Sequence, residues 1–360
     1  MTGVLSGLRV LEFAAIGPVP WTGMLLADLG ASVVRIERPG SRAERDTLGA
    51  VRRGRLQVEL DLKSREGHEA ACRLAEQADV LLEGLRPGVM ERLGLGPDEA
   101  LARNPRLVYG RMTGWGQAGP MAQRAGHDIN YIALSGVLHA IGPHDKPVPP
   151  LNLIGDFGGG GAFLIMGVLA ALWQVRASGR GQVVDAAMVD GSAALMALIY
   201  SRLNLGQWQD MRASNPLDGG VPWYDTYRTA DGRFMAVGAL EPQFYEELLE
   251  RLGLADSLPD RLDPRHWPVI RERFTQVFAS RSRDEWARHF EGSDACVSPV
   301  LSMAEAPHDP HLTARGTFAD WRGAPVPASA PRFNDERPAL APESTLVSLQ
   351  EALARWASPR

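Results

Sequence analysis

The sequence predicts an α/β protein in which helices cover both faces of a parallel sheet. Between residues 8 and 190, short runs rich in leucine and β-branched residues alternate with segments of helix length, and the connections are short. A hairpin pattern with an Asp-Gly turn then begins near Tyr224. The change of pattern predicts a second, smaller α+β domain.

The elements of the first region follow from local signals. Gly30 ends one helix, Ser64 caps another, and Pro87 and Pro97 stand at helix-entry positions. The expected strands are 8–13, 32–36, 79–83, 107–112 and 183–186. The expected helices are 20–29, 64–77, 87–93, 97–103, 162–173 and 188–205. The first strand leads into neither a G-x-G-x-x-G nor a P-loop, so no dinucleotide or P-loop site is expected.

The second region continues with a hairpin over 227–238 and helices at 241–252, 267–279 and 283–291. A final amphipathic helix at 346–356 is expected to pack back on the first domain. The predicted organisation is a large domain over 1–205 completed by 325–360, a linker over 206–223, a small domain over 224–310 and a return linker over 311–324.

Composition excludes several classes of protein. The net charge of −5 argues against nucleic-acid binding. Cys72 and Cys296 provide neither a disulfide framework nor a metal set, so we expect no metal and a reducing, cytoplasmic location. We expect no signal peptide at the first residues and no membrane partner, because each apolar run is interrupted before about 18 residues.

The charge balance reverses locally between Arg35 and Arg65. Nine basic residues stand there against five acids. The pattern fits a solvated face or a site for an anion such as phosphate. The basic residues are Arg35, Arg38, Arg42, Arg45, Arg52, Arg53, Arg55, Lys63 and Arg65.

Two titratable residues are candidates for proton transfer. His127 lies in Gly-His-Asp, and Asp156 precedes four glycines and an apolar helix, so we expect its neighbouring N–H groups to be free at a helix N-terminus. An imidazole and a carboxyl of raised pKa can together remove and return a proton beside a carbonyl. The residues also allow plainer roles: a structural histidine, and an aspartate that only caps a helix.

Several sequence blocks are shared with one known family. On these blocks the chain resembles the family III CoA-transferase superfamily, and within it the branch that racemises 2-methylacyl-CoA thioesters. The resemblance covers nearly the whole chain. The blocks are 7–12, 26–31, 35–40, 60–63, 114–117, 126–131, 155–157 and 179–185.

The resemblance implies a Rossmann-like large domain, a smaller α+β domain and an interlocked homodimer. It implies an active site where the large domain of one subunit meets the small domain of the other. CoA would enter as part of an acyl-CoA substrate, with no further cofactor required. The positions that match CoA-contacting residues of the family are Arg38, Leu60, Asp61, Leu62, Lys63, Gly126, Asp128, Ile129, Asn130 and Tyr131. Arg86 and Arg92 are further candidates for contact with CoA.

The resemblance also assigns catalytic roles. His127 and Asp156 match an acid/base pair that epimerises the 2-position through an enolate, and Glu241 matches a small-domain glutamate that supports the histidine. One alternative is a CoA-transferase in which Asp156 is a nucleophile that forms an acyl anhydride. Another is a non-catalytic CoA-binding scaffold. The acyl path departs from the methionine clusters of some racemases, since Leu195 and Leu198 flank Met196.

Overall fold

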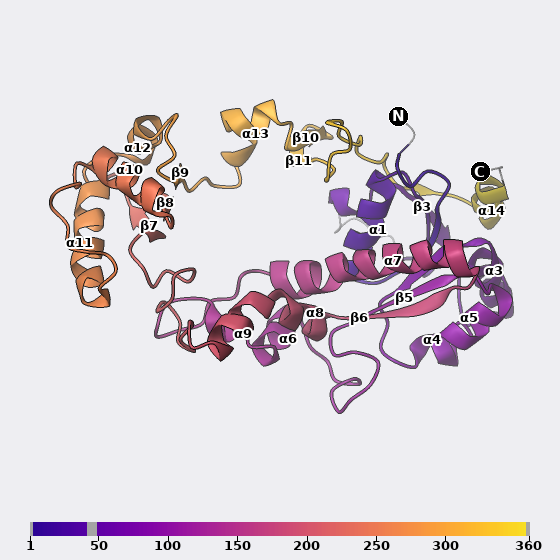
Figure 1. Cartoon of the computed structure of the whole chain (residues 1–360). Helices are drawn as coiled ribbons and strands as arrows, with labels where there is room; N and C mark the ends of the chain where they lie inside the picture. Colours follow the sequence, from indigo (N-terminus) through magenta and orange to yellow (C-terminus); the bar gives the residue numbers. More distant parts are fainter. Residues whose placement is uncertain (1–2, 42–48, 358–360) are drawn as a thin grey trace. The chain divides into compact units, whose positions relative to one another are not determined.

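The computed structural model describes residues 3–41 and 49–357, which form two compact units (Figure 1). The first unit comprises Met1–Ser135, Pro150–Met196 and His311–Arg360, and the second comprises Gly136–Pro149 and Ala197–Pro310. The sequence-based boundaries differ at 136–149, 197–223 and 311–324, which they assign to the large domain or to linkers.

A seven-stranded sheet organises the first unit, and every neighbouring pair of strands in it is parallel. The order β3-β2-β1-β4-β5-β6, with β12 beside β3, is that of a Rossmann-like doubly wound sheet, whose direction of winding changes between β1 and β4. The predicted fold class is therefore confirmed. The strands are β1 (Arg9–Phe13), β2 (Ser32–Glu37), β3 (Arg55–Glu59), β4 (Val80–Glu83), β5 (Val108–Thr113), β6 (Gln182–Ala187) and β12 (Thr345–Leu346).

Helices cover both faces of the sheet, and each face has its own apolar core. On one face Val19 and Leu26 of α1 pack with Leu164 and Val168 of α7. On the other, α3, α5 and α14 contribute buried residues, and Trp356 of α14 donates a hydrogen bond to Ser32 Oγ (3.0 Å), which confirms that the last helix returns to this unit. The helices are α1 (Pro18–Asp28), α3 (Arg65–Gln77), α4 (Val89–Arg92), α5 (Pro97–Arg103), α6 (Asp128–Leu134), α7 (Phe163–Ser178), α8 (Met188–Leu195) and α14 (Leu349–Ala357).

The glycine run is helical, so the helix predicted to begin at 162 begins nine residues earlier, at Leu153. A π-helix, η3 (Leu153–Ala162), continues directly into α7. Its glycines allow close packing: a Cβ at Gly159 would lie 2.5 Å from Ser192 N, and one at Gly161 would lie 2.5 Å from the ring of Trp21. The run therefore brings η3 against α1 and α8 instead of forming a flexible loop.

Leu153–Ser178 is long and apolar enough to cross a membrane by length and composition alone. The same test is passed by core helices, and Leu164, Val168 and Ala171 of this helix are buried in the first unit. The finding is weak support for a membrane span.

Four of the seven described members of the predicted basic cluster are buried, so these four form neither a solvated face nor an anion site. Glu12, itself fully buried, pairs with Arg35 and with Arg55, whose Nε lies 3.1 Å from Glu12 Oε2. Burial lowers the pKa of Arg55, and Glu12 opposes that effect. The buried arginines are Arg35, Arg52, Arg53 and Arg55.

The other two buried arginines have carboxylate partners as well. Arg53 makes a two-pronged contact with Asp28 (2.8 and 2.6 Å), and Arg52 donates to Glu37 (2.8 Å). These contacts tie the residues just before β3 to β2 and α1. Among the described members of the cluster, Arg38, Lys63 and Arg65 are exposed. Two further members, Arg42 and Arg45, lie outside the described residues.

The sequence prediction also missed β3 and merged two helices. β3 carries Arg55, Gln57 and Glu59, so its composition is polar, although Arg55 is buried and paired with Glu12. The helix predicted over 188–205 is α8 followed by α9 (Ala197–Asn204), with a break at Met196.

The second unit has an antiparallel sheet, β7-β8-β9, packed with helices. Its core is aromatic, with Tyr227, Phe274, Phe278 and Trp286 buried. The predicted hairpin and helices are present. They are β7 (Tyr224–Arg228), β8 (Phe234–Gly238), β9 (Val297–Pro299), α10 (Pro242–Leu252), α11 (Trp267–Phe278) and α12 (Arg283–His289).

Candidate functional site

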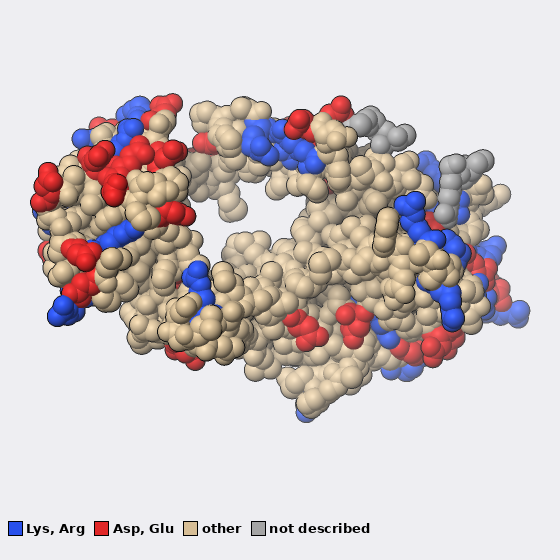
Figure 2. All heavy atoms as spheres, viewed as in Figure 1, with Lys and Arg blue, Asp and Glu red and all other residues tan. Residues whose placement is uncertain are grey.

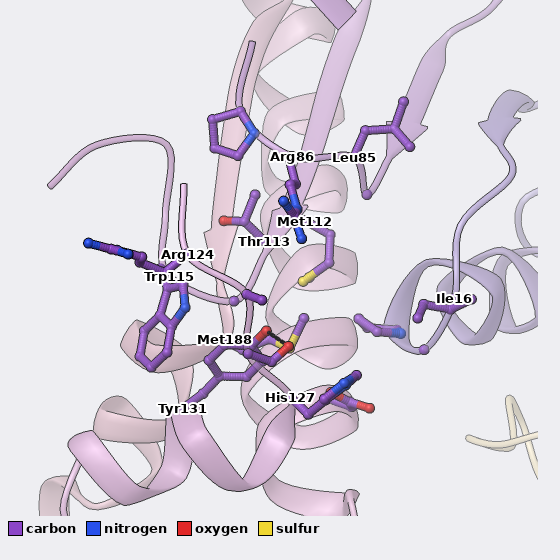
Figure 3. A pocket seen from close by; sticks show the side chains of 18 of the residues that line it. Ile16, Leu85, Arg86, Met112, Thr113, Trp115, Arg124, His127, Tyr131 and Met188 are labelled. Atoms are coloured by element: carbon purple, nitrogen blue, oxygen red, sulfur yellow. Dashed lines mark hydrogen bonds between the residues drawn. The ribbon is translucent and has the colours of Figure 1, made fainter. Parts of the chain in front are cut away.

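A cavity of about 530 Å³ opens in the first unit at the carboxyl ends of β1, β4 and β5 (Figure 3). Ile16 and Gly17 follow β1, Gly84 to Pro87 follow β4, and Gly114 and Trp115 follow β5. Ligands of doubly wound sheets bind at this edge, where the order of strands reverses. The cavity therefore occupies the position that the topology favours for a ligand.

His127 lies on the wall of this cavity, at the residue that precedes α6. Its backbone N–H donates to Oδ1 of Asn130 (3.0 Å), so Asn130 holds the main chain at the start of the helix. The imidazole is exposed in the unit.

Asp156 lies on the same wall, four residues into the π-helix. Its carboxyl is half-buried, and Asn152 Nδ2 donates to its Oδ2 (3.0 Å). Burial raises the pKa of Asp156, and the charge of Asp128 raises it further, against the opposing effects of Asn152 and His127. A carboxyl of raised pKa is suited to give as well as take a proton.

One of the N–H groups predicted to be free is engaged. Asp156 lies in the first turn of η3, where an N–H has no acceptor within the helix, and its N–H donates to Asp128 Oδ2 (2.7 Å).

Apolar and aromatic side chains complete the cavity. Trp115 and Tyr131 pack edge to face, with ring centroids 4.7 Å apart, and Met112 and Met188 lie beside them (Figure 3). The hydroxyl of Tyr131 donates to Gly126 O, and burial raises its pKa. The tyrosine therefore serves as a wall of fixed orientation next to the two titratable residues.

The cavity brings together only some of the predicted site residues. Asp128, Ile129 and Asn130 belong to α6 beside it, but they do not line it. Those that line it are Arg86, Gly126, His127, Tyr131 and Asp156. Those elsewhere in the first unit are Arg38, Leu60, Asp61, Leu62, Lys63 and Arg92, of which Arg38, Asp61, Lys63 and Arg92 are exposed and Leu60 and Leu62 pack on the core.

Glu241 belongs to the second unit. It stands at the N-cap of α10, yet its carboxylate makes no cap hydrogen bond and is exposed. Arg261 donates to the carbonyls of Ala239 (3.3 Å) and Leu240 (3.2 Å) and lies over the ring of Tyr245, so the main chain before Glu241 is well supported. The main chain before Glu241 is therefore held in place, while its carboxylate does not cap the helix that it begins.

The sequence prediction missed several residues that line the cavity. Asn152 precedes Asp156 by four residues, a spacing that would have been informative had the helix been predicted to begin at 153. Arg124 is exposed at the cavity and adds a second cation to Arg86. Among the described residues, no group of three or more His, Cys, Asp and Glu is arranged to hold a metal ion.

Comparisons with known proteins agree on one family. The sequence model of CoA-transferase family III matches residues 5–344. The alpha-methylacyl-CoA racemases of Mus musculus and Homo sapiens are each 48% identical to this chain, over 91% and 87% of it and over 86% and 82% of their own lengths. A solved CAIB/BAIF family protein from Brucella suis is 26% identical, with a TM-score of 0.81 over 99% of both chains.

Proposed function

The chain belongs to CoA-transferase family III, and we propose that it is a racemase that interconverts the epimers of 2-methylacyl-CoA thioesters. One observation carries the proposal: an imidazole and a carboxyl from separate elements, His127 and Asp156, line one cavity at the ligand-binding edge of the sheet. The identity of 48% to racemases over most of the chain supports the choice of reaction.

The chemistry needs one base and one acid on opposite sides of the 2-carbon. One residue accepts the 2-proton as the C–H bond breaks, and the electron pair moves onto the thioester carbonyl as an enolate. The other residue delivers a proton to the opposite face, and the enolate collapses back to the thioester. For the other epimer the roles of His127 and Asp156 are exchanged. The raised pKa of Asp156 makes its protonated form accessible nearer to neutral pH.

The cavity supplies suitable contacts for the rest of the substrate. Arg86 and Arg124 are exposed cations for the phosphates of CoA, and Arg38 and Lys63 remain proposed contacts farther along the unit. Met112, Met188 and Trp115 form an apolar wall for the acyl chain. No metal or further cofactor enters this scheme, in which CoA arrives with the substrate.

A homodimer is part of the proposal. In the first unit the helical run Leu153–Ser178 leaves large apolar side chains exposed, including Met166 (58%) and Trp173 (72%), and Figure 2 shows few charged residues over α7 in this view. A second copy of the chain would cover this surface. We propose that Glu241 then supports the imidazole of His127, as the resemblance implies, since its carboxylate has no cap contact of its own.

The test follows a single 2-methylacyl-CoA epimer incubated with the protein in D₂O. We expect deuterium at the 2-position together with formation of the other epimer. His127→Ala and Asp156→Ala should each reduce both by roughly 10²–10⁴-fold, with acyl-CoA affinity retained. We also propose a cytoplasmic location, because Cys72 and Cys296 are both free thiols.

The transferase alternative predicts a different outcome. Asp156 would then form an acyl anhydride, which hydroxylamine traps, and CoA would move to a free acid without exchange at the 2-position. Trapping of such a species by wild-type protein, with no deuterium incorporation, would replace the racemase proposal. Stabilisation of the fold by acyl-CoA without either reaction would indicate a scaffold.

A further inference from the structure

Asp128 is a buried carboxylate that joins the two elements bearing the proposed catalytic residues. It follows His127 as the first residue of α6, and its side chain is 6% exposed. Its Oδ2 accepts the backbone N–H of Asp156 (2.7 Å), and its Oδ1 has no hydrogen-bond partner among the described residues. It does not line the cavity.

The plainer role of Asp128 is that of an acid in the first turn of a helix, where the helix dipole favours a negative charge. That role needs no burial, and burial of a carboxylate with an unpaired oxygen costs free energy. A neutral acceptor would hold the N–H of Asp156 without this cost. The charge itself therefore calls for an explanation.

Gly155 provides a second observation that points to the same contact. A Cβ at this position would lie 2.5 Å from Asp128 Oδ2, so only glycine lets the carboxylate reach the N–H of residue 156. The φ of Gly155 lies outside the left-handed region, so the backbone alone would accept alanine. The glycine is thus matched to the aspartate.

We propose that Asp128 is a positioning residue for racemisation: it fixes the segment of Asp156 relative to the helix of His127, and it places a second carboxylate next to Asp156. The inference rests on the proposed function. It reassigns Asp128 from the CoA contact that the family resemblance implied to a group that acts through Asp156.

The charge has a definite effect on Asp156. Burial is the largest cause of its raised pKa, and Asp128 acts in the same direction, while Asn152 and His127 act in the opposite direction. Tyr131 also faces the pair from α6. Burial is the largest cause of the raised pKa of its phenol, and both carboxylates add to it. The acid of α8, Asp190, acts instead on Asp185.

Asp128→Asn separates the charge from the contact, because its amide oxygen still accepts the N–H of Asp156. We expect the acidic limb of the pH profile of kcat/KM to move to lower pH, since a more acidic Asp156 stays ionised further into the acid range. We expect turnover at neutral pH to fall about tenfold, as less Asp156 is protonated. Asp79→Asn is the matched control: that carboxylate also accepts a backbone N–H, from Arg9 at 2.9 Å, but at the amino ends of β1 and β4.

Gly155→Ala tests the contact while the charge is kept. We expect a fall in kcat of about 10²-fold from displacement of Asp156. In the Asp128→Ala background the same substitution should add less than about twofold, because the carboxylate that collides with the new Cβ is gone. This cycle also tests the proposal if Asp128→Asn folds poorly.

The outcomes are distinguishable from failure of the proposed function. If wild-type protein exchanges no 2-proton, the racemase proposal fails. If wild-type protein is active, the positioning role is overturned by an unmoved acidic limb in Asp128→Asn, or by a Gly155→Ala cost that is equal with and without Asp128. A purely structural role would lower thermal stability and leave the pH profile in place.

Discussion

Two groups of acids in the first unit carry their charges in opposite ways. In the group around Glu12, Glu37 and Asp28, each carboxylate lies within 3.1 Å of a guanidinium nitrogen. At the cavity, Asp128 and Asp156 lie against each other, and the polar neighbour of Asp156 is the neutral amide of Asn152. The first arrangement cancels charge, and the second concentrates it.

The two arrangements suit different roles: acids paired with arginines hold the fold together, and acids beside one another at the cavity suit proton transfer. The carboxylate of Glu12 is taken up by ion pairs with Arg35 and Arg55, and these pairs join β1, β2 and β3. A carboxyl beside a like charge in a half-buried site is closer to holding a proton, which is the property that catalysis needs. Four arginines of the predicted basic cluster, Arg35, Arg52, Arg53 and Arg55, belong to the buried ion pairs.

The largest expected effect that tests this contrast is on folding. Glu12→Gln would leave Arg35 and Arg55 buried without their shared counter-charge, so we expect a loss of about 3–5 kcal/mol in the free energy of unfolding. Urea denaturation measures it. Glu69→Gln, which breaks an exposed pair with Arg65, should change the same quantity by less than about 0.5 kcal/mol. If the Glu12 variant were as stable as wild type, the claim that the ion pairs of Glu12 stabilise the fold would be wrong.

Asp156→Asn, which removes a negative charge at the cavity, should raise the free energy of unfolding at pH 7, whereas Glu12→Gln should lower it. The pKa of Asp156 is raised in the folded chain, so its contribution to stability is present below its unfolded pKa of about 4 and is lost as pH rises through the folded value. Asp156→Asn should therefore be more stable than wild type at pH 7, by no more than about 1 kcal/mol after solvent screening. The gain should vanish near pH 3.

Thermal unfolding of the two proteins across this pH range measures the effect. A variant that is less stable than wild type at pH 7 would mean that Asp156 is held by favourable contacts, and the contrast with Glu12 would fail. The same variant should lack racemisation, which would show that the charge is kept for chemistry at the expense of stability.

The sequence predicted the fold well where apolar runs mark buried strands, as in Val80–Glu83 and Ser32–Glu37. It missed Arg55–Glu59, because the composition of this strand is polar, although Arg55 is buried and paired with Glu12. The helical state of the glycine run was missed for a related reason. Glycine disfavours helix locally, and only the close approach of α8 and Trp21 explains four glycines there.

The candidate site shows the same limit. His127 and Asp156 could be chosen from residue chemistry and family resemblance, and the structure places both at one cavity. The hydrogen bond from Asp156 to Asp128 joins residues 28 apart and depends on how η3 packs on α6, so no local pattern predicts it. Glu241 lies in the second unit, and its role remains a prediction.

The smallest expected effect concerns the arginines that are left exposed. Arg86→Gln and Arg124→Gln should each raise KM for acyl-CoA by about 3–10-fold with kcat nearly unchanged, because an exposed cation near a phosphate contributes on the order of 1 kcal/mol. The effect should shrink as ionic strength rises, since salt screens exposed charges. Arg65→Gln, far from the cavity, serves as the exposed control, and Arg53→Gln should lower stability without changing KM. Steady-state kinetics at two salt concentrations measures these effects. If Arg53→Gln raised KM while Arg86→Gln and Arg124→Gln did not, the assignment of CoA binding to the exposed arginines and of stability to the buried ones would be wrong.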